Sequence, residues 1–197
     1  DINMDLHTLT LTFDETVRVD SFDRSNASIV NGGGDAVPLA AAASDSGSAE
    51  DEDDSIIVID LLLEEMNTIK ILSELAVSQQ TTMLQIGSSL VKDMNSNAIE
   101  AIAPGLTVDG YTPDTSAPTL KSFILNLDGN YDYLELSFDE TVDASTFDFS
   151  QFTFHATNDI TAEDATTIHR LTGGTVLTSD GPVVRIELSQ EDRDEIK

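Results

Sequence analysis

The chain has 197 residues, nine basic side chains against 37 acidic ones, and a net charge of −28. Nucleic acids and anionic lipids are bound by clustered Lys and Arg, so this balance argues against both and makes cations the expected partners. The absence of cysteine excludes a disulfide framework, a thiolate metal site and a cysteine nucleophile. No apolar run approaches the ~18 residues needed to cross a bilayer.

Apolar and polar residues alternate over residues 8–13, which predicts a half-buried strand with Leu9 and Leu11 on one face. Residues 55–63 are rich in β-branched side chains and predict a central strand. The apolar spacing of residues 63–75 then predicts a short helix. Further strands are predicted at 81–86, 89–92, 98–102 and 106–108.

Residues 109–118 combine two prolines and a glycine with no periodicity, which predicts an interdomain linker. Beyond the linker, residues 120–127 and 131–138 predict a hairpin around a glycine-containing turn. Residues 182–188 predict another central strand, and Ser189 is placed to cap a following helix.

The chain repeats itself. Residues 9–29 align without a gap with residues 134–154, at an offset of 125 and with ten identities in 21 positions. A second block, 55–70, matches 182–197 at an offset of 127. The difference of two fits an indel in the loops between the blocks, where insertions cost least.

One period suits a β-sandwich domain of about 100 residues. We therefore predict one whole sandwich at 1–113 and an incomplete second one at 114–197, each with a short helix in a crossover. The second copy lacks a counterpart of 71–113, and the first lacks one of 118–123. We expect a segment of a longer polypeptide, or a protomer whose partner chain donates strands to the open edge of the second domain.

Four motifs are similar to those of bacterial-type Ig-like repeats of the S-layer and adhesin kind, whose motifs are a D-T-x-x-P linker, an F-S-E-x-V-D strand end and a D-x-x-G-N hairpin. They are Asp-Thr-Ser-Ala-Pro at 114–118, Phe-Asp-Glu-Thr-Val-Asp at 138–143, and the turns at 148–152 and 93–97. The sequence departs from the family at Arg18, at Ser96, and in the Asp that replaces Ser in both Phe-Asp-Glu blocks. The resemblance implies an all-β chain of tandem Ig-like sandwiches, extracellular or at the cell surface, with no catalytic residues to transfer.

A calcium site is predicted where the linker meets the second domain. If the first hairpin of that domain returns its second strand to the linker, five acidic residues come together there: Asp109, Asp114, Asp139, Glu140 and Asp143. Converging hard oxygen ligands suit calcium, which would stiffen the joint. A second calcium site is predicted at the turn that contains Asp93, Asn95 and Asn97. The alternative is that these carboxylates cap turns through backbone N–H groups.

Asn26 begins the only N-glycosylation sequon, Asn-Ala-Ser at 26–28. We predict glycosylation at Asn26 only if the chain follows a eukaryotic secretory route. We expect a non-catalytic structural or adhesive repeat of a larger surface or filament protein. The alternative is a carbohydrate- or protein-binding module attached to a secreted enzyme or adhesin. An Asp-Ser-Gly triplet at 45–47 matches the aspartic-protease motif but has no preceding apolar strand and no second copy.

Overall fold

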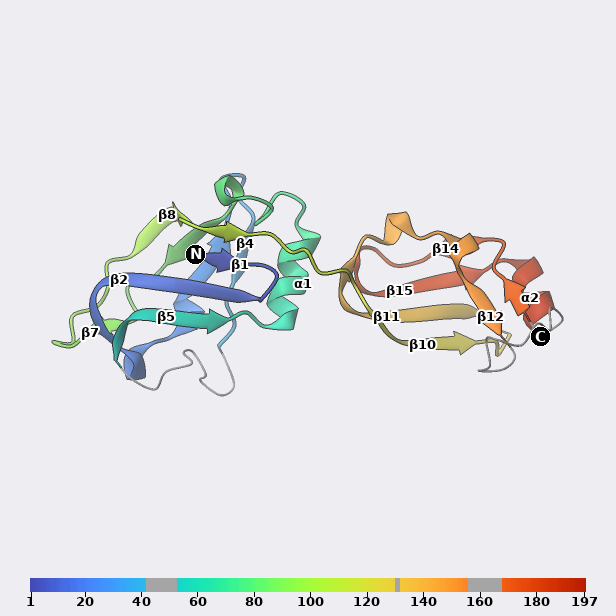
Figure 1. Ribbon diagram of the computed structural model, residues 1–197, viewed down its shortest axis with the longest axis horizontal. Helices are drawn as coiled ribbons and strands as arrows, with labels where there is room; N and C mark the ends of the chain where they lie inside the picture. Colours follow the sequence, from blue (N-terminus) through green and yellow to red (C-terminus); the bar gives the residue numbers. More distant parts are fainter. Residues whose placement is uncertain (42–52, 130–131, 156–167) are drawn as a thin grey trace. The chain divides into compact units, whose positions relative to one another are not determined.

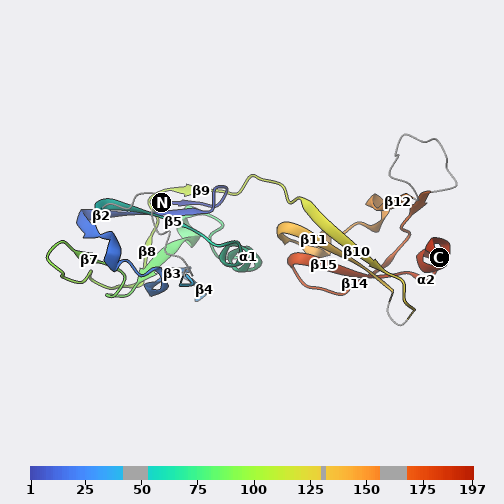
Figure 2. The same cartoon turned by 90° about the horizontal axis from the view of Figure 1, so that it is seen from below.

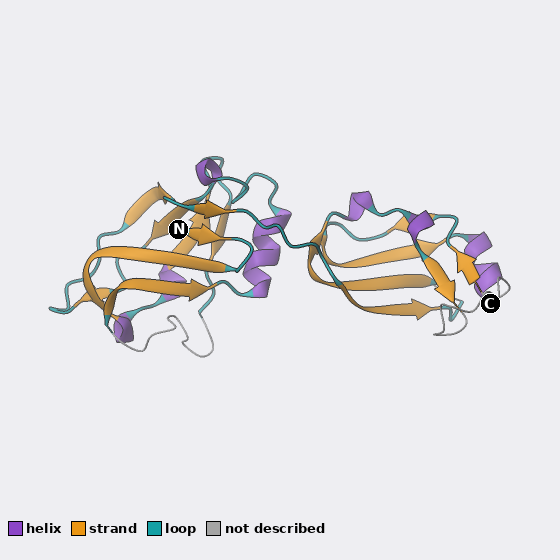
Figure 3. Ribbon diagram, in the orientation of Figure 1, coloured by secondary structure: helices purple, strands orange, loops and turns teal. Residues whose placement is uncertain are grey.

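The computed structural model describes residues 1–41, 53–129, 132–155 and 168–197. Strands dominate these residues, and their α-helices are two short ones, α1 and α2, so the prediction of an all-β chain is confirmed (Figures 1 and 3). The chain divides into two compact units, Asp1–Ala117 and Pro118–Lys197. The protease-like triplet at 45–47 and the tip of the predicted hairpin at 130–131 lie outside the described residues.

The first unit has two sheets that lie in separate layers (Figure 2). One sheet has the order β5-β2-β1-β9, with β7 also beside β2. Its strands are β1 Ile2–Asn3, β2 Thr8–Arg18, β5 Asp54–Asp60, β7 Lys92–Asp93 and β9 Tyr111–Thr112. The other sheet has the order β4-β3-β6-β8. Its strands are β3 Ala27–Val30, β4 Ala36–Pro38, β6 Met83–Ile86 and β8 Ile102–Thr107.

Both sheets of the first unit contribute to one apolar core. Leu9 and Ile59 come from the first sheet and Ile29 from the second, and all three are buried. The helix α1, Leu63–Ile71, adds Met66 and Ile69 to the same cluster. Successive side chains of a strand face opposite sides, so the alternation read from residues 8–13 places Leu9 and Leu11 in this core, with Phe13 partly buried against it.

The second unit contains a four-stranded sheet in the order β10-β11-β15-β14 and a separate two-stranded sheet, β12-β13. Its strands are β10 Leu120–Asn126, β11 Tyr133–Val142, β12 Thr153–His155, β13 Ile168–Arg170, β14 Gly174–Val176 and β15 Gly181–Leu188. The helix α2, Gln190–Ile196, begins after Ser189, whose hydroxyl accepts a hydrogen bond from the Asp192 backbone as predicted.

The repeat seen in the sequence is also a repeat of strand register. In the first unit Leu9 of β2 pairs with Ile59 of β5. In the second, Leu134 of β11 pairs with Ile186 of β15, which are the residues at offsets of 125 and 127. Short 3-10 helices follow each long strand at matching positions: Val19–Ser21 and Arg24–Asn26 in the first unit, Ala144–Thr146 and Phe149–Gln151 in the second.

Several predicted elements differ from the observed ones. The helix predicted at 63–75 ends at Ile71, and Leu72 is already extended. The strand predicted at 98–102 is reduced to a single bridge between Ala98 and Lys92. Apolar residues in these short segments pack as loop residues against the core, as Ile99 does, so composition alone overestimated the number of strands.

Candidate functional site

Most acidic residues predicted as calcium ligands accept hydrogen bonds within their own unit. In the Asp93 turn, one carboxylate oxygen accepts the backbone N–H groups of Asn95 at 2.9 Å and Asn97 at 2.7 Å. The other oxygen accepts the side-chain amide of Asn97 at 2.6 Å. These bonds, led by that from the Asn97 side chain, lower the pKa of Asp93. The side chain therefore organises the turn as an anion, and Ser96 takes the left-handed conformation there, with φ of 69°.

The predicted linker site draws two ligands from the first unit and three from the second, so each half is described separately. In the first unit, Asp114 forms an ion pair with Lys70 at 2.5 Å and accepts the Ser116 N–H at 2.9 Å. The backbone carbonyl of Asp109 accepts the Gln79 side-chain amide at 2.7 Å. A calcium ion that used Asp114 would therefore compete with a lysine that is already in place.

The linker residues are held by a second carboxylate of the first unit. Asp5 accepts the backbone N–H of Thr115 at 3.0 Å, its hydroxyl at 3.1 Å and the Ser116 hydroxyl at 3.0 Å. The backbone hydrogen bond from Thr115 is the main cause of the lowered pKa of Asp5. These bonds and the Asp114 pair explain why the first unit extends to Ala117, beyond the predicted boundary at residue 113.

In the second unit, Asp139 accepts the Thr119 backbone N–H at 2.6 Å and lies 3.0 Å from the Lys121 ammonium. The Thr119 hydrogen bond first, and the Lys121 one second, lower the pKa of Asp139 to about 2. Asp143 accepts the Ser145 N–H at 2.9 Å and its hydroxyl at 2.6 Å, which caps the following 3-10 helix. Glu140 is half-buried near the end of β11.

These contacts are the turn-capping arrangement that the sequence left open as the alternative to calcium. Within the described residues, no group of three or more Asp, Glu, His or Cys side chains is arranged to hold a metal ion. Calcium binding at either predicted site stays a prediction.

Among the residues that the structure describes, no helix has the length and apolar character to cross a membrane.

The glycosylation candidate lies at the end of a 3-10 helix. The Asn26 amide nitrogen, the atom that a glycan would modify, donates to an Asp23 carboxylate oxygen at 2.8 Å. Asp23 also accepts from Ser25 and caps this helix, as Asp148 does for the matching helix of the second unit. Modification of Asn26 would have to break the Asp23 contact.

A buried ion pair was not predicted. Arg24 and Glu65 are each about nineteen-twentieths buried, with side chains 6% and 5% exposed, and their charged groups lie 2.6 Å apart. Glu65 also accepts the backbone N–H groups of Ala40 at 2.7 Å and Leu62 at 2.8 Å. It thereby joins the first turn of α1 to the chain that leaves β4.

The second unit places a buried carboxylate at the same point of its helix. Asp192, at an offset of 127 from Glu65, is fully buried and accepts the backbone N–H groups of Thr172 at 2.8 Å and Gly173 at 3.2 Å. Burial alone would raise its pKa, but these bonds and those from Ser189 and His169 lower it. An acidic residue at both aligned positions was the available sequence signal.

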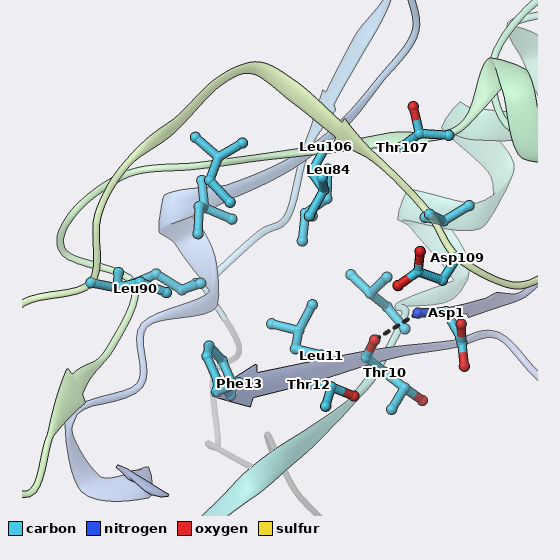
Figure 4. A pocket seen from close by; sticks show the side chains of 15 residues that line it. Asp1, Thr10, Leu11, Thr12, Phe13, Leu84, Leu90, Leu106, Thr107 and Asp109 are labelled. Atoms are coloured by element: carbon cyan, nitrogen blue, oxygen red, sulfur yellow. Dashed lines mark hydrogen bonds between the residues drawn. The ribbon is translucent and has the colours of Figure 1, made fainter. Parts of the chain in front are cut away.

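An apolar groove opens along β2 in the first unit, with a volume of about 390 Å³. Leu11 and Phe13 of β2 line one side, and Leu84 of β6 and Leu106 of β8 line the other (Figure 4). Asp1 closes one end, where its ammonium group donates to the Thr10 carbonyl. The first copy has no sequence counterpart of residues 118–123, but a groove was not predicted here.

No family model, curated protein or solved structure matches this chain.

Proposed function

We propose that the chain is a non-catalytic structural or adhesive repeat of a larger cell-surface or filament protein, built from tandem Ig-like β-sandwich units. The observation that supports this most strongly is the duplicated ladder, in which Leu9–Ile59 and Leu134–Ile186 are equivalent pairs. Units that repeat in series along one chain are typical of scaffolds and stalks, in which each unit is a spacer.

The linker contacts support a mechanical role. Asp5 and Lys70 hold residues 114–116 on the first unit, so the chain leaves that unit from a fixed point. A short, proline-containing segment that begins at a fixed point has little conformational freedom, which suits a spacer that must hold an orientation. Calcium at Asp109, Asp114, Asp139, Glu140 and Asp143 is proposed as an additional clamp on this joint.

The test is a calcium titration of the full chain by calorimetry, paired with small-angle X-ray scattering with and without chelator. We expect saturable binding and a more extended, stiffer particle when calcium is bound. Asp143→Asn should weaken binding, whereas the matched variant Asp148→Asn should not, because both carboxylates cap a 3-10 helix through a serine N–H at 2.9 Å but only Asp143 is a proposed ligand.

Equal loss in the two variants, or scattering that chelator leaves unchanged, would refute the calcium clamp. Saturable binding of a glycan to the full chain, measured on an array and repeated in solution, would refute the purely structural role and favour the binding-module alternative.

A further inference from the structure

The two units hold an equivalent buried carboxylate in different ways. Glu65 and Asp192 are each the third residue of a helix, and these helices follow the equivalent strands β5 and β15. Only 5% of the Glu65 side chain is exposed, and none of the Asp192 side chain. Each accepts a backbone N–H group from the segment after β4 or β13, from Ala40 in the first unit and from Thr172 in the second.

The strands β4 and β13 are also equivalent elements. Each pairs antiparallel with the strand that follows the 3-10 helices, β3 or β12. Val37 lies opposite Ile29, and His169 lies opposite Phe154, which is the counterpart of Ile29 at the offset of 125. Val37 is buried in the core of the first unit, so His169 occupies a core position of the repeat.

The basic and the apolar residue have exchanged places around this carboxylate. In the first unit Arg24, from a 3-10 helix, lies 2.6 Å from the carboxylate, and Val37 is the apolar residue on β4. In the second unit the counterpart of Arg24 is Phe149, which packs against the core. The basic residue comes instead from β13, where the His169 Nε2 atom lies 3.0 Å from an Asp192 oxygen. This exchange indicates that the repeat requires a basic partner for its buried carboxylate.

Histidine differs from arginine because it can lose its charge. Arginine stays charged in proteins, whereas a histidine changes its charge between pH 5 and 8. Burial raises the pKa of Asp192, but hydrogen bonds from Thr172, Ser189 and His169 outweigh this and lower it. An ionised carboxylate only accepts, so the His169 Nε2 atom carries a proton even in the neutral ring. A second proton, on Nδ1, converts this hydrogen bond into a buried ion pair.

Among the described residues, Asp192 is the titratable group that the structure places against His169. The remaining charged or titratable groups of β12, β13 and α2 are exposed or bonded to other residues: His155, Arg170, Glu191, Asp194 and Glu195 are exposed, Arg193 donates to Gln190, and Lys197 pairs with Asp132. The charge of His169 therefore acts mainly on Asp192.

We propose that the second unit contains a proton-operated latch: uptake of a proton by His169 strengthens its bond to Asp192 and tightens α2 against β13. Because the folded unit favours the charged ring, the added stability is complete below about pH 6.5, where an unfolded histidine takes up its proton. It is lost at higher pH, as the folded unit releases the proton. In the first unit Arg24 keeps the equivalent contact closed throughout. The latch goes beyond the proposed structural role and does not depend on calcium.

The test is urea unfolding of the second unit at about pH 5.5 and about pH 8, within the full chain. Replacing Tyr111 and Tyr131 by phenylalanine leaves Tyr133 as the only tyrosine fluorophore. We expect the ratio of folded to unfolded second unit, extrapolated to water, to be about fivefold larger at the lower pH, because hydrogen bonds between charged groups are the stronger ones. His169→Gln keeps a side-chain N–H donor but cannot become charged, and it should lose this difference.

A matched variant and a local measurement separate the latch from general effects of acid. His155→Gln removes an exposed histidine from the neighbouring strand and should keep the fivefold difference. Hydrogen exchange in the folded chain reads the latch directly, since the Thr172 and Gly173 amides donate to Asp192 at 2.8 and 3.2 Å. After correction for the intrinsic exchange rate, their protection should rise at the lower pH in the parent chain but not in His169→Gln.

An equal dependence on pH in the parent and in His169→Gln would overturn the proposal, as would unchanged protection of Thr172 and Gly173. Loss of the difference in His155→Gln would overturn it as well, because the effect would then belong to the general field of a chain with a net charge of −28.

Discussion

Glu65→Gln should remove much of the stability of the first unit. The glutamate accepts hydrogen bonds from two backbone N–H groups and from Arg24, all in a buried environment. Glutamine retains one acceptor oxygen, and its NH₂ group must face another donor. Removing one partner of a buried ion pair costs about 3–5 kcal/mol because the remaining charge is left uncompensated. With a urea dependence of about 2 kcal/mol/M, a loss of about 4 kcal/mol lowers the unfolding midpoint by about 2 M.

The assay is urea unfolding of the full chain, followed by a signal from the first unit alone. The chain has no tryptophan and its tyrosines are at 111, 131 and 133. A background with Tyr131→Phe and Tyr133→Phe leaves Tyr111, whose hydroxyl donates to the Ala76 carbonyl at 2.7 Å, as the only tyrosine fluorophore. The chain has two compact units, and a protein of several domains need not unfold in one two-state step, so a probe in one unit is needed for a two-state fit.

Two controls define what would refute the reasoning. Asp20→Asn breaks the Arg18–Asp20 pair, which is exposed and 2.8 Å long, and should cost at most about 1 kcal/mol. A chain with Arg24→Met and Glu65→Met together removes both buried charges and should recover part of the loss. A midpoint for Glu65→Gln as close to the parent as that of Asp20→Asn would show that the buried pair does not hold α1 in place.

Three further outcomes are expected. Asp139→Asn should remove an acid-dependent loss of stability from the second unit, which acid-unfolding curves would show. The pKa of Asp139 is about 2 in the folded chain against an ordinary 3.8. Its contribution to stability is therefore complete above about pH 4 and is lost as the pH falls through 2. Gly174→Ala should lower the melting temperature, because its φ is 157° and a new Cβ would lie 2.3 Å from a carbonyl oxygen of β15. Asp5→Ala should speed amide exchange at Thr115, and unchanged exchange there would show that the linker is held by other contacts.

The strand ladders were predictable from sequence because they depend on local alternation. The period of two places Leu9 and Leu11 on one face of β2, and Leu134 and Leu136 on one face of β11. The prediction that residues 55–63 form a central strand was wrong: within the described residues β5 has β2 as its one neighbour, whereas its counterpart β15 is flanked by β11 and β14. A β-branched run indicates a strand but not how many neighbours it has.

The buried pair was not predictable because its residues are 41 positions apart and only one of them is repeated. Glu65 has an acidic counterpart in Asp192, but Arg24 aligns with Phe149, and the second unit supplies His169 to its buried carboxylate instead. Polar groups that are satisfied by long-range contacts leave no periodic signal in the sequence. The same holds for the Lys70–Asp114 pair, which ties the linker to the first unit.

The carboxylates affect the stability of the folded chain in two ways, and these two effects change in opposite directions with pH. A net charge of −28 destabilises any compact state by self-repulsion, which acid relieves as carboxylates become neutral. Hydrogen bonds, in contrast, lower the pKa of six capping or paired carboxylates: Asp5, Asp93, Asp132, Asp139, Asp148 and Asp192. These six favour the folded chain only while ionised, so their contribution is complete above the ordinary pKa of 3.8 and is lost below it. Mild acidification toward pH 4 therefore relieves repulsion before it breaks the caps. A cation that screens the surface would do the same without protonating any carboxylate, so monovalent salt, which screens without specific coordination, distinguishes general screening from a calcium site.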